Sequence, residues 1–166
     1  MKKILLVFML GILTHESEAQ LDSLTFDFWI GKWDASWQNS KGESEHGTNL
    51  IERILDGSVL QEHFEIVSGA NKGFKGTSIS VWNSRSKTYH QAWADNQGGY
   101  FDFTGEVDGD RKIFKTAPRT RDNQVIIQRM VFYDIKENSF TWDWESSMDS
   151  GNTWSLMWRI NYTRSN

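Results

Sequence analysis

The chain has 166 residues, no cysteine and a formal net charge of −4 at pH 7. With this charge and no long basic run, nucleic acid and anionic membranes are excluded as favoured partners. The absence of cysteine excludes disulfides and a lipid anchor attached through a cysteine. Nine Trp, ten Phe and four Tyr can still stabilise one domain, because each buried aromatic side chain removes about 150–250 Å² from water.

The first residues have the pattern of a secretory signal peptide. The pattern is a basic start at Lys2, an apolar run over residues 4–13, and small residues before a cleavage point after Ala19. The run is too short to cross a bilayer, although an uncleaved anchor lying in the membrane interface is an alternative. We predict a mature domain of residues 20–166 that has no integral membrane segment. It is expected to be soluble in the periplasm or the extracellular space.

The mature part is predicted to begin with one short helix and to continue as strands only. Leu21, Leu24 and Phe28 have helical spacing within Leu21–Trp29, and Gly31 ends the pattern. Ten strand segments follow, separated by turn residues, with no gap long enough for a crossover helix. The sequence therefore predicts an all-β fold, a ten-stranded antiparallel up-and-down barrel. The predicted strands are Trp33–Asn39, His46–Ile54, Val59–Val67, Lys75–Trp82, Thr88–Asp95, Tyr100–Val107, Lys112–Thr116, Val125–Ile135, Phe140–Ser146 and Thr153–Tyr162.

Alternation along the strands predicts which side chains face the barrel interior. In four strands the larger apolar set is assigned inward; these sets are Leu60, Glu62, Phe64 and Ile66, then Tyr89, Gln91, Trp93 and Asp95, then Phe140, Trp142 and Trp144, and last Trp154, Leu156, Trp158, Ile160 and Tyr162. In residues 125–133 both alternating sets are apolar. The set that contains Arg129 is a possible inward set there.

Four segments, in a fixed order, carry a family pattern: Phe26-Asp27-Phe28-Trp29-Ile30-Gly31-Lys32-Trp33, Leu55-Asp56-Gly57, Tyr89 with Trp93 and Asp95, and Tyr162-Thr163-Arg164. Together they resemble a bacterial family known as domain of unknown function 1579, over nearly the whole mature chain. The resemblance implies a lipocalin-like barrel of the calycin superfamily, with a strand number closer to fatty-acid-binding proteins and nitrobindins. It implies no established activity. It also implies that Trp33 stacks on Arg164 and closes one end of the barrel.

The histidines argue against a metal or haem cofactor. His46, His63 and His90 show no paired spacing of the kind that zinc sites use. Nitrobindin-like barrels hold haem through a histidine on a late strand, and no histidine follows His90 in this chain. We therefore expect no cofactor and no metal.

Residues Ser147–Trp154 match the Asp-box pattern Ser-x-Asp-x-Gly-x-Thr-Trp of bacterial sialidases. Sialidases carry several copies of this motif, away from their catalytic residues. Here a single copy joins the last two predicted strands. We interpret it as a hairpin device in which Asp149 accepts hydrogen bonds from the turn and Trp154 packs beneath it.

Glu62 is the main candidate for a binding residue because it lies on an otherwise apolar inward face. A buried carboxylate needs a partner or a raised pKa. Arg129 and Arg53 are the cations in suitable register, and Arg129 is the favoured partner. Such a pair would orient a ligand with an apolar body and one polar or anionic end. The other predicted ligand-binding residues are Gln91, Trp93, Asp95, Trp142, Trp144 and Trp158. The alternative is that Glu62 is solvated at the barrel mouth and that the aromatics only fill the core.

The leading hypothesis for function is an exported barrel that binds a small, mostly apolar or amphipathic molecule in its lumen. A first alternative is a small barrel enzyme, an isomerase or hydrolase, in which Glu62 acts with His63 or Asp95. A second alternative is a packed barrel without a lumen that binds a protein partner. The size of the internal cavity separates this last hypothesis from the others.

Overall fold

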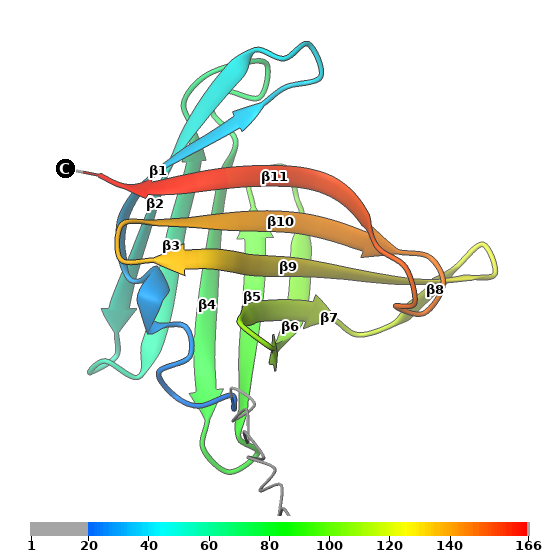
Figure 1. The fold of residues 1–166 in the computed structure, drawn as a ribbon. Helices are drawn as coiled ribbons and strands as arrows, with labels where there is room; N and C mark the ends of the chain where they lie inside the picture. The colour runs from blue at the N-terminus through cyan, green and yellow to red at the C-terminus, as the bar shows by residue number, and fades with distance from the viewer. Residues whose placement is uncertain (1–19, 166) are drawn as a thin grey trace, which may run out of the picture.

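The computed structural model describes residues 20–165, which are almost entirely β-structure (Figure 1). They contain one 3₁₀ turn, η1 (Asp27–Trp29), and eleven strands. The strands are β1 (Gly31–Gln38), β2 (Ser44–Ile54), β3 (Val59–Ile66), β4 (Lys75–Asn83), β5 (Thr88–Asp95), β6 (Tyr100–Asp108), β7 (Arg111–Thr116), β8 (Arg119–Arg121), β9 (Gln124–Lys136), β10 (Ser139–Ser147) and β11 (Ser155–Arg164). The predicted signal peptide lies outside the described residues. No helix within residues 20–165 is long and apolar enough to span a bilayer.

Ten of the strands form a closed antiparallel barrel, which confirms the predicted architecture. Strands β1 to β7 pair in sequence order, β7 pairs with β9, and β9, β10 and β11 follow. Pairing of β11 with β1 closes the sheet, with Trp33 opposite Arg164. Figure 1 shows β9, β10 and β11 crossing the direction of β3 to β6, so that the interior lies between two groups of strands.

The eleventh strand, β8, was not predicted and lies outside the closed barrel. It pairs only with the start of β9, through a turn at Asp122 and Asn123. Both turn residues have positive φ, 50° and 62°, as a two-residue hairpin turn of the primed type requires. Three residues that directly follow Pro118 are too few to give an alternating pattern, so periodicity does not reveal this strand.

The predicted helix over Leu21–Trp29 is wrong, because only the three residues of η1 are helical. The buried side chains of this segment are Phe26, directly before η1, and Trp29, its last residue, which are three positions apart, as on one face of a 3₁₀ helix. Leu24, which the helical spacing placed on the buried face, is 63% exposed. The segment is thus a series of tight turns over residues 22–30 that directs two aromatic side chains into the barrel.

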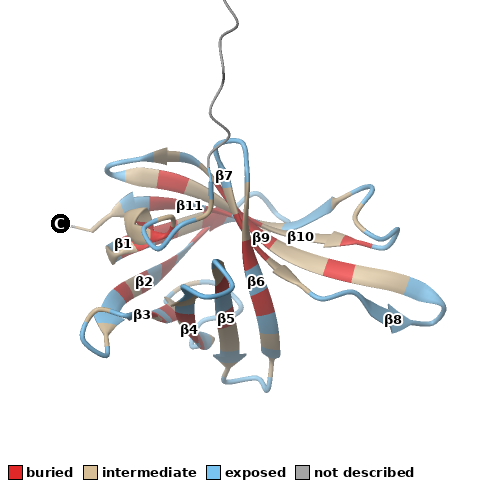
Figure 2. Ribbon diagram, turned by 90° about the horizontal axis from the view of Figure 1, so that it is seen from below, coloured by how far each residue is buried: buried red, intermediate tan, exposed pale blue. Residues whose placement is uncertain are grey.

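Alternation of buried and exposed residues confirms most of the predicted inward faces, as Figure 2 shows along the strands. The start of β11 departs from the prediction, since the Leu156 side chain is 49% exposed. The pairing of β10 with β11 shifts between Trp144 and Glu145, which leaves Met157 without a partner. This β-bulge reverses the alternation, so Trp158 faces inward whereas Trp154 and Leu156 do not follow the predicted inward set.

A cluster of aromatic side chains fills part of the barrel interior. Phe26 stacks on Phe114 with ring centroids 4.2 Å apart, and it meets Tyr89 edge-on at 5.0 Å. The Tyr89 hydroxyl donates to the carbonyl of Ser23 at 2.6 Å, which holds the lead segment in place. We call this group the Phe26 cluster; it consists of Phe26, Phe28, Tyr89, Phe114, Phe132 and Phe140.

Arg164 closes the chain against the first strand, as the resemblance implied. Its guanidinium lies 3.8 Å from the ring centroid of Trp33 and donates to the carbonyl of Ile30 at 2.5 Å. Gly31 has a φ of +128°, and a Cβ there would lie 2.0 Å from Arg164 Nη1. Glycine is therefore required at this position both by the backbone and by the arginine that passes over it.

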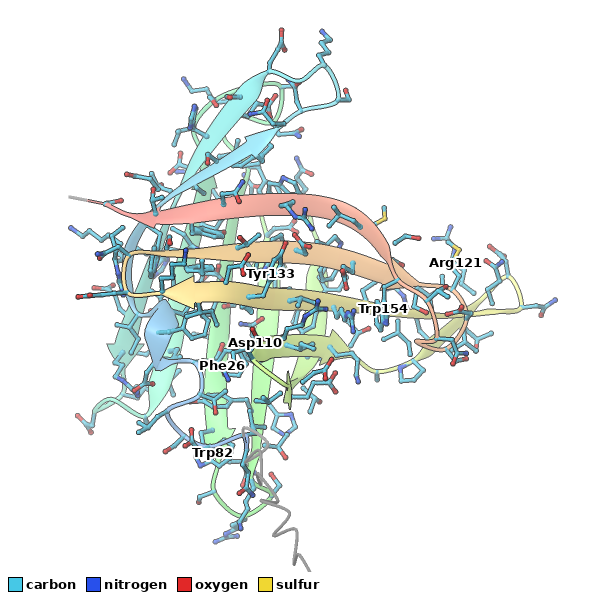
Figure 3. The ribbon with its side chains drawn as sticks, in the orientation of Figure 1. Phe26, Trp82, Asp110, Arg121, Tyr133 and Trp154 are labelled. Atoms are coloured by element: carbon cyan, nitrogen blue, oxygen red, sulfur yellow. The ribbon has the colours of Figure 1, made fainter. Side chains whose placement is uncertain are left out.

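The Asp-box forms the hairpin turn that the sequence predicted. Asp149 Oδ1 accepts from the backbone N–H of Thr153 at 2.9 Å, and Asp149 Oδ2 accepts from the Thr153 hydroxyl at 2.7 Å. These hydrogen bonds lower the pKa of Asp149 to about 2. Trp154 Nε1 donates to the Gly151 carbonyl at 3.1 Å. Figure 3 places Trp154 on the projecting part of β9, β10 and β11, well away from Phe26.

Candidate functional site

A cavity of about 170 Å³ lies in the barrel interior beside the Phe26 cluster. Its wall includes six of the eight predicted binding residues, namely Glu62, Trp93, Asp95, Trp142, Trp144 and Trp158. The remaining wall consists of Trp29, Phe64, Phe74, Phe101, Phe103, Met130, Ile160 and Tyr162. We call this space the lumen cavity. Its existence argues against the hypothesis of a barrel packed without a lumen.

Glu62 is buried in the wall of the lumen cavity, with 5% of its surface exposed. Asn49 Nδ2 on β2 donates to Glu62 Oε1 at 2.7 Å, and Ser78 Oγ on β4 donates to Glu62 Oε2 at 2.7 Å. Burial raises the pKa of Glu62 to about 7, although both hydrogen bonds act to lower it. The carboxyl group therefore changes its charge close to neutral pH.

The predicted pair of Glu62 and Arg129 is wrong. Arg129 Nε donates to Glu145 at 2.6 Å, and its guanidinium lies 3.7 Å from the ring centroid of Trp154. Its neighbour Met130 lines the lumen cavity, so Arg129 is on the outer face of β9. Both alternating sets of β9 are apolar, which removes the signal that would have told the two faces apart.

The other suggested cation, Arg53, is also not a partner of Glu62. It forms an ion pair with Asp27 and donates to the Gly57 carbonyl at 2.6 Å. It therefore links η1 to the turn that joins β2 and β3. Within residues 20–165 Glu62 has neutral hydrogen-bond donors and no ion-pair partner.

Gln91 and Asp95, both predicted inward on β5, have different positions. Gln91 is buried but lies outside the lumen cavity, where its Nε2 donates to Ser80 Oγ at 2.9 Å. Asp95 lines the cavity and accepts from the backbone N–H groups of Gln97 and Gly99 at 2.9 and 2.8 Å. Burial raises the pKa of Asp95, but hydrogen bonds from Gly99, Gln97 and Trp93 outweigh it and lower the pKa overall.

Indole rings form much of the cavity wall. Trp142 and Trp144 are parallel, with centroids 6.5 Å apart, and Trp158 meets Trp142 edge-on at 5.8 Å. Phe101 packs against the edge of Trp144 at 5.5 Å. Trp93, Trp142, Trp144 and Trp158 are only partly buried, in contrast to the fifth tryptophan of the wall, Trp29, and to Trp33 in the packed core. The open faces of these rings provide a surface for an apolar or cationic group.

Four polar groups in the wall or directly behind it were not among the predicted binding residues. Asn49 and Ser78 hold the Glu62 carboxyl, and Asn49 could have been found because it lies on the same face of β2 as the buried Ile51. Tyr162 is buried beside Glu62, and burial together with the charge of Glu62 raises its pKa well above 10. Trp29 Nε1 has no hydrogen-bond acceptor, so this indole N–H remains available in the wall.

A second hollow, of about 740 Å³, adjoins the lumen cavity at the rim of the barrel. The two spaces share Phe74 and Trp158 in their walls. Glu45 lines this rim hollow and accepts from Asn39 Nδ2 and from Trp37 Nε1, each at 3.1 Å. The amide of Asn39 is the largest cause that lowers the pKa of Glu45, so this carboxylate is charged at neutral pH.

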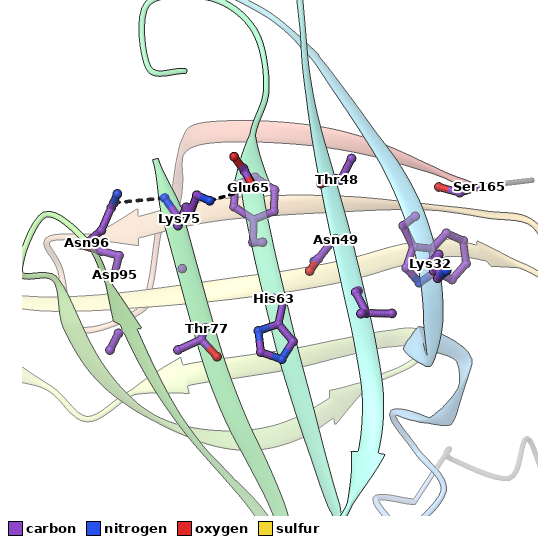
Figure 4. Close-up of a pocket in the computed structure, with 15 residues that line it drawn as sticks. Lys32, Thr48, Asn49, His63, Glu65, Lys75, Thr77, Asp95, Asn96 and Ser165 are labelled. Atoms are coloured by element: carbon purple, nitrogen blue, oxygen red, sulfur yellow. Dashed lines mark hydrogen bonds and ion pairs between the residues drawn. The ribbon is translucent and has the colours of Figure 1, made fainter. Parts of the chain in front are cut away.

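A third depression lies on the outer face of β1 to β5 (Figure 4). His63 and Thr77 lie side by side in it, and Lys75 pairs with Glu65 at 3.2 Å. His63 is exposed, whereas the adjacent Glu62 is buried and points inward. Glu62 and His63 therefore lie on opposite faces of β3 and cannot act as an acid and base on one substrate.

No family model matches the chain, and no curated protein shows significant sequence similarity to it. The resemblance to domain of unknown function 1579 therefore remains a prediction from the four sequence segments.

Proposed function

We propose that this chain is an exported binding protein that takes up one compact, mostly apolar molecule in its lumen. The observation that supports the proposal is the lumen cavity, in which aromatic rings surround a single buried carboxyl group. Small-molecule sites commonly combine an apolar wall with a few placed polar groups. Glu62, held by Asn49 and Ser78, supplies such a group at a fixed position.

The size of the cavity limits the ligand. An engineered cavity of about 150 Å³ in another protein takes up benzene, so 170 Å³ accommodates a molecule with one substituted ring. Drug-sized ligands usually occupy about 300–1,000 Å³. The proposal therefore favours compact aromatic or alicyclic molecules over fatty acids and retinoids.

Native mass spectrometry of the gently purified protein tests for a ligand that remains bound. Isothermal titration calorimetry with indole, benzyl alcohol, benzylamine and benzoate then measures direct binding. We expect a co-purified compound of low mass, or binding of at least one probe with a dissociation constant below about 1 mM. The proposal is abandoned if neither is found.

A pair of variants on β6 locates the binding. Phe101→Trp adds bulk to a wall residue of the lumen cavity, whereas Tyr100→Trp adds it at the adjacent exposed side chain. We expect the first variant to weaken probe binding by about tenfold or more. The second should leave binding within about twofold of wild type. Equal effects of the two variants would place the binding site outside the lumen.

A further inference from the structure

We propose that the ligand of the lumen cavity is a compact organic cation, an ammonium group on a small apolar or aromatic body, whose charge faces Glu62. This inference rests on the proposed function and names the class of ligand for the same site. It follows from the signs of the charges around the cavity, the position of Glu62 and the orientation of the rings.

Every charged residue that lines the lumen cavity is acidic. Among the lining residues that the structure describes, Glu62 and Asp95 carry carboxyl groups, and none is a lysine, arginine or histidine. The adjoining rim hollow adds Glu43 and Glu45 against one basic residue, Lys41. A ligand that enters from the rim therefore meets a mostly negative path, which favours a cation over an anion.

The carboxyl group of Glu62 is buried and hydrogen-bonded, but it has no positively charged partner among the described residues. A buried carboxylate is costly unless a cation or several hydrogen bonds stabilise it. Here Asn49 and Ser78 supply two neutral hydrogen bonds, while Arg129 and Arg53, the partners suggested by the sequence, are engaged elsewhere. An ammonium group in the cavity would complete the site with a charge-assisted hydrogen bond.

The rings of the wall are arranged as surfaces for a positive charge. A cation within about 6 Å of an aromatic centroid is attracted to the ring face, and tryptophan is the strongest of the three ring types. Trp142 and Trp144 lie parallel, and Trp158 stands at 89° to Trp142. Tryptophan rings in two perpendicular orientations thus border the lumen cavity, whose wall also contains the Glu62 carboxyl.

The pH dependence of the binding affinity distinguishes a cationic ligand from a neutral one. The groups that face Glu62 are Asn49 on β2, Ser78 on β4 and Tyr162 on β11; Asp95 on β5 is the other acid of the wall. An ammonium ion prefers ionised Glu62, so its affinity should rise by about tenfold between pH 6 and pH 8. A neutral hydrogen-bond acceptor prefers protonated Glu62, so its affinity should fall over the same range.

The test compares benzylamine, benzyl alcohol and benzoate, which share one body and differ in the charge of the head. Calorimetric titration uses wild type, Glu62→Gln and the control Glu65→Gln, which removes an outward carboxylate from the same strand. We expect wild type at pH 8 to bind benzylamine at least about tenfold more tightly than benzyl alcohol. Glu62→Gln should lose this preference while it retains benzyl alcohol, and Glu65→Gln should keep it.

The outcomes separate this inference from the proposed function. If benzyl alcohol or benzoate binds as tightly as benzylamine, or if the preference survives in Glu62→Gln, the lumen binds a ligand but the proposal of a cationic ligand is refuted. If neither indole nor any of the three probes binds and no compound co-purifies, both proposals fail. The pH series on wild type gives an independent answer, because benzylamine affinity that falls from pH 6 to pH 8 also overturns the inference.

Discussion

Two regions of the barrel interior use the same kinds of residue and pack them in different ways. In the Phe26 cluster the ring of Phe26 is fully buried and lies 4.2 Å from that of Phe114. Around the lumen cavity the parallel rings of Trp142 and Trp144 are 6.5 Å apart, and about 170 Å³ of space remains beside them. Aromatic content alone therefore does not distinguish a filled barrel from a hollow one.

The difference comes from the segment that precedes β1. The turn η1 and the residue directly before it insert Trp29 and Phe26 into the barrel, and the Ser23 carbonyl holds Tyr89 against them. Arg164 then fastens the same segment from the other terminus through Ile30 and Trp33. Within the described residues no comparable segment fills the space between Trp93 and Trp158, so that space remains a cavity.

The largest expected effect comes from removing the ring that fills the packed region. Phe26→Ala should lower the free energy of unfolding by about 3–5 kcal/mol, since it deletes a fully buried ring. Phe101→Ala in the cavity wall should cost roughly half as much or less, because that ring is only partly buried. Urea unfolding followed by circular dichroism measures both. Equal losses would show that the two regions are packed alike.

The cavity region should instead make the stability of the protein depend on pH. Because burial raises the pKa of Glu62 from 4.5 to about 7, the folded state binds this proton more tightly than the unfolded state. The contribution of Glu62 to stability is therefore greatest below pH 4.5. It is lost as the pH rises to about 7, by a total of about 3 kcal/mol.

Urea unfolding of wild type and Glu62→Gln between pH 5 and pH 8 isolates this contribution. The difference between the two proteins should shift in favour of Glu62→Gln as the pH rises. Glu65→Gln, on the outer face of the same strand, should follow wild type. A difference that is constant with pH would show that Glu62 is ionised throughout and solvated.

The same substitution at two glycines compares the regions directly. A Cβ on Gly105 would lie 2.7 Å from the Cβ of Tyr89 and 3.4 Å from ring atoms of Phe26 and Phe114. A Cβ on Gly76 would lie 2.0 Å from Cζ2 of Trp93, whose ring borders the lumen cavity. Gly105→Ala should cost about 1–3 kcal/mol because its neighbours cannot move.

Gly76→Ala should cost less, because the indole of Trp93 can shift into the cavity. It should instead weaken the binding of benzylamine, which would compete with the displaced ring. Unfolding and calorimetry on the two variants give both quantities. If Gly105→Ala is the one that weakens binding, the cavity and the packed region have been assigned the wrong way round.

The sequence predicts the barrel well because the side-chain direction in a strand repeats every two residues. A strand turned with its other face inward would bury polar groups. The inward set that contains Glu62 and Phe64 is buried as predicted, and Phe140 is buried on β10, where Trp142 and Trp144 are partly buried around the cavity. Prediction failed where this signal is weak or interrupted. Both faces of β9 are apolar, and one bulge residue, Met157, reverses the alternation of β11.

The candidate site was predicted in part for the same reason. Glu62 stands out as an acid on an apolar face, whereas its true partners, Asn49 and Ser78, are neutral residues on neighbouring strands. Pairing between strands, rather than alternation within one, brings these three together. The volume of the cavity depends on how far η1 fills the barrel, and a three-residue turn leaves almost no periodic signal.

The smallest effect is expected at Arg129, which belongs to neither region of the interior. Arg129→Met removes the stack on Trp154 and the ion pair with Glu145, and should cost about 1–2 kcal/mol. Adding Glu145→Gln should recover part of this loss, because no unpaired carboxylate is left against the sheet. Affinity for benzylamine should stay within about twofold of wild type, since Arg129 lies on the outer face of β9. Double-mutant unfolding and calorimetry check these points. If Arg129→Met lost binding without a change in stability, Arg129 would face the lumen after all. The apolar residues on both faces of β9 are compatible with that orientation too.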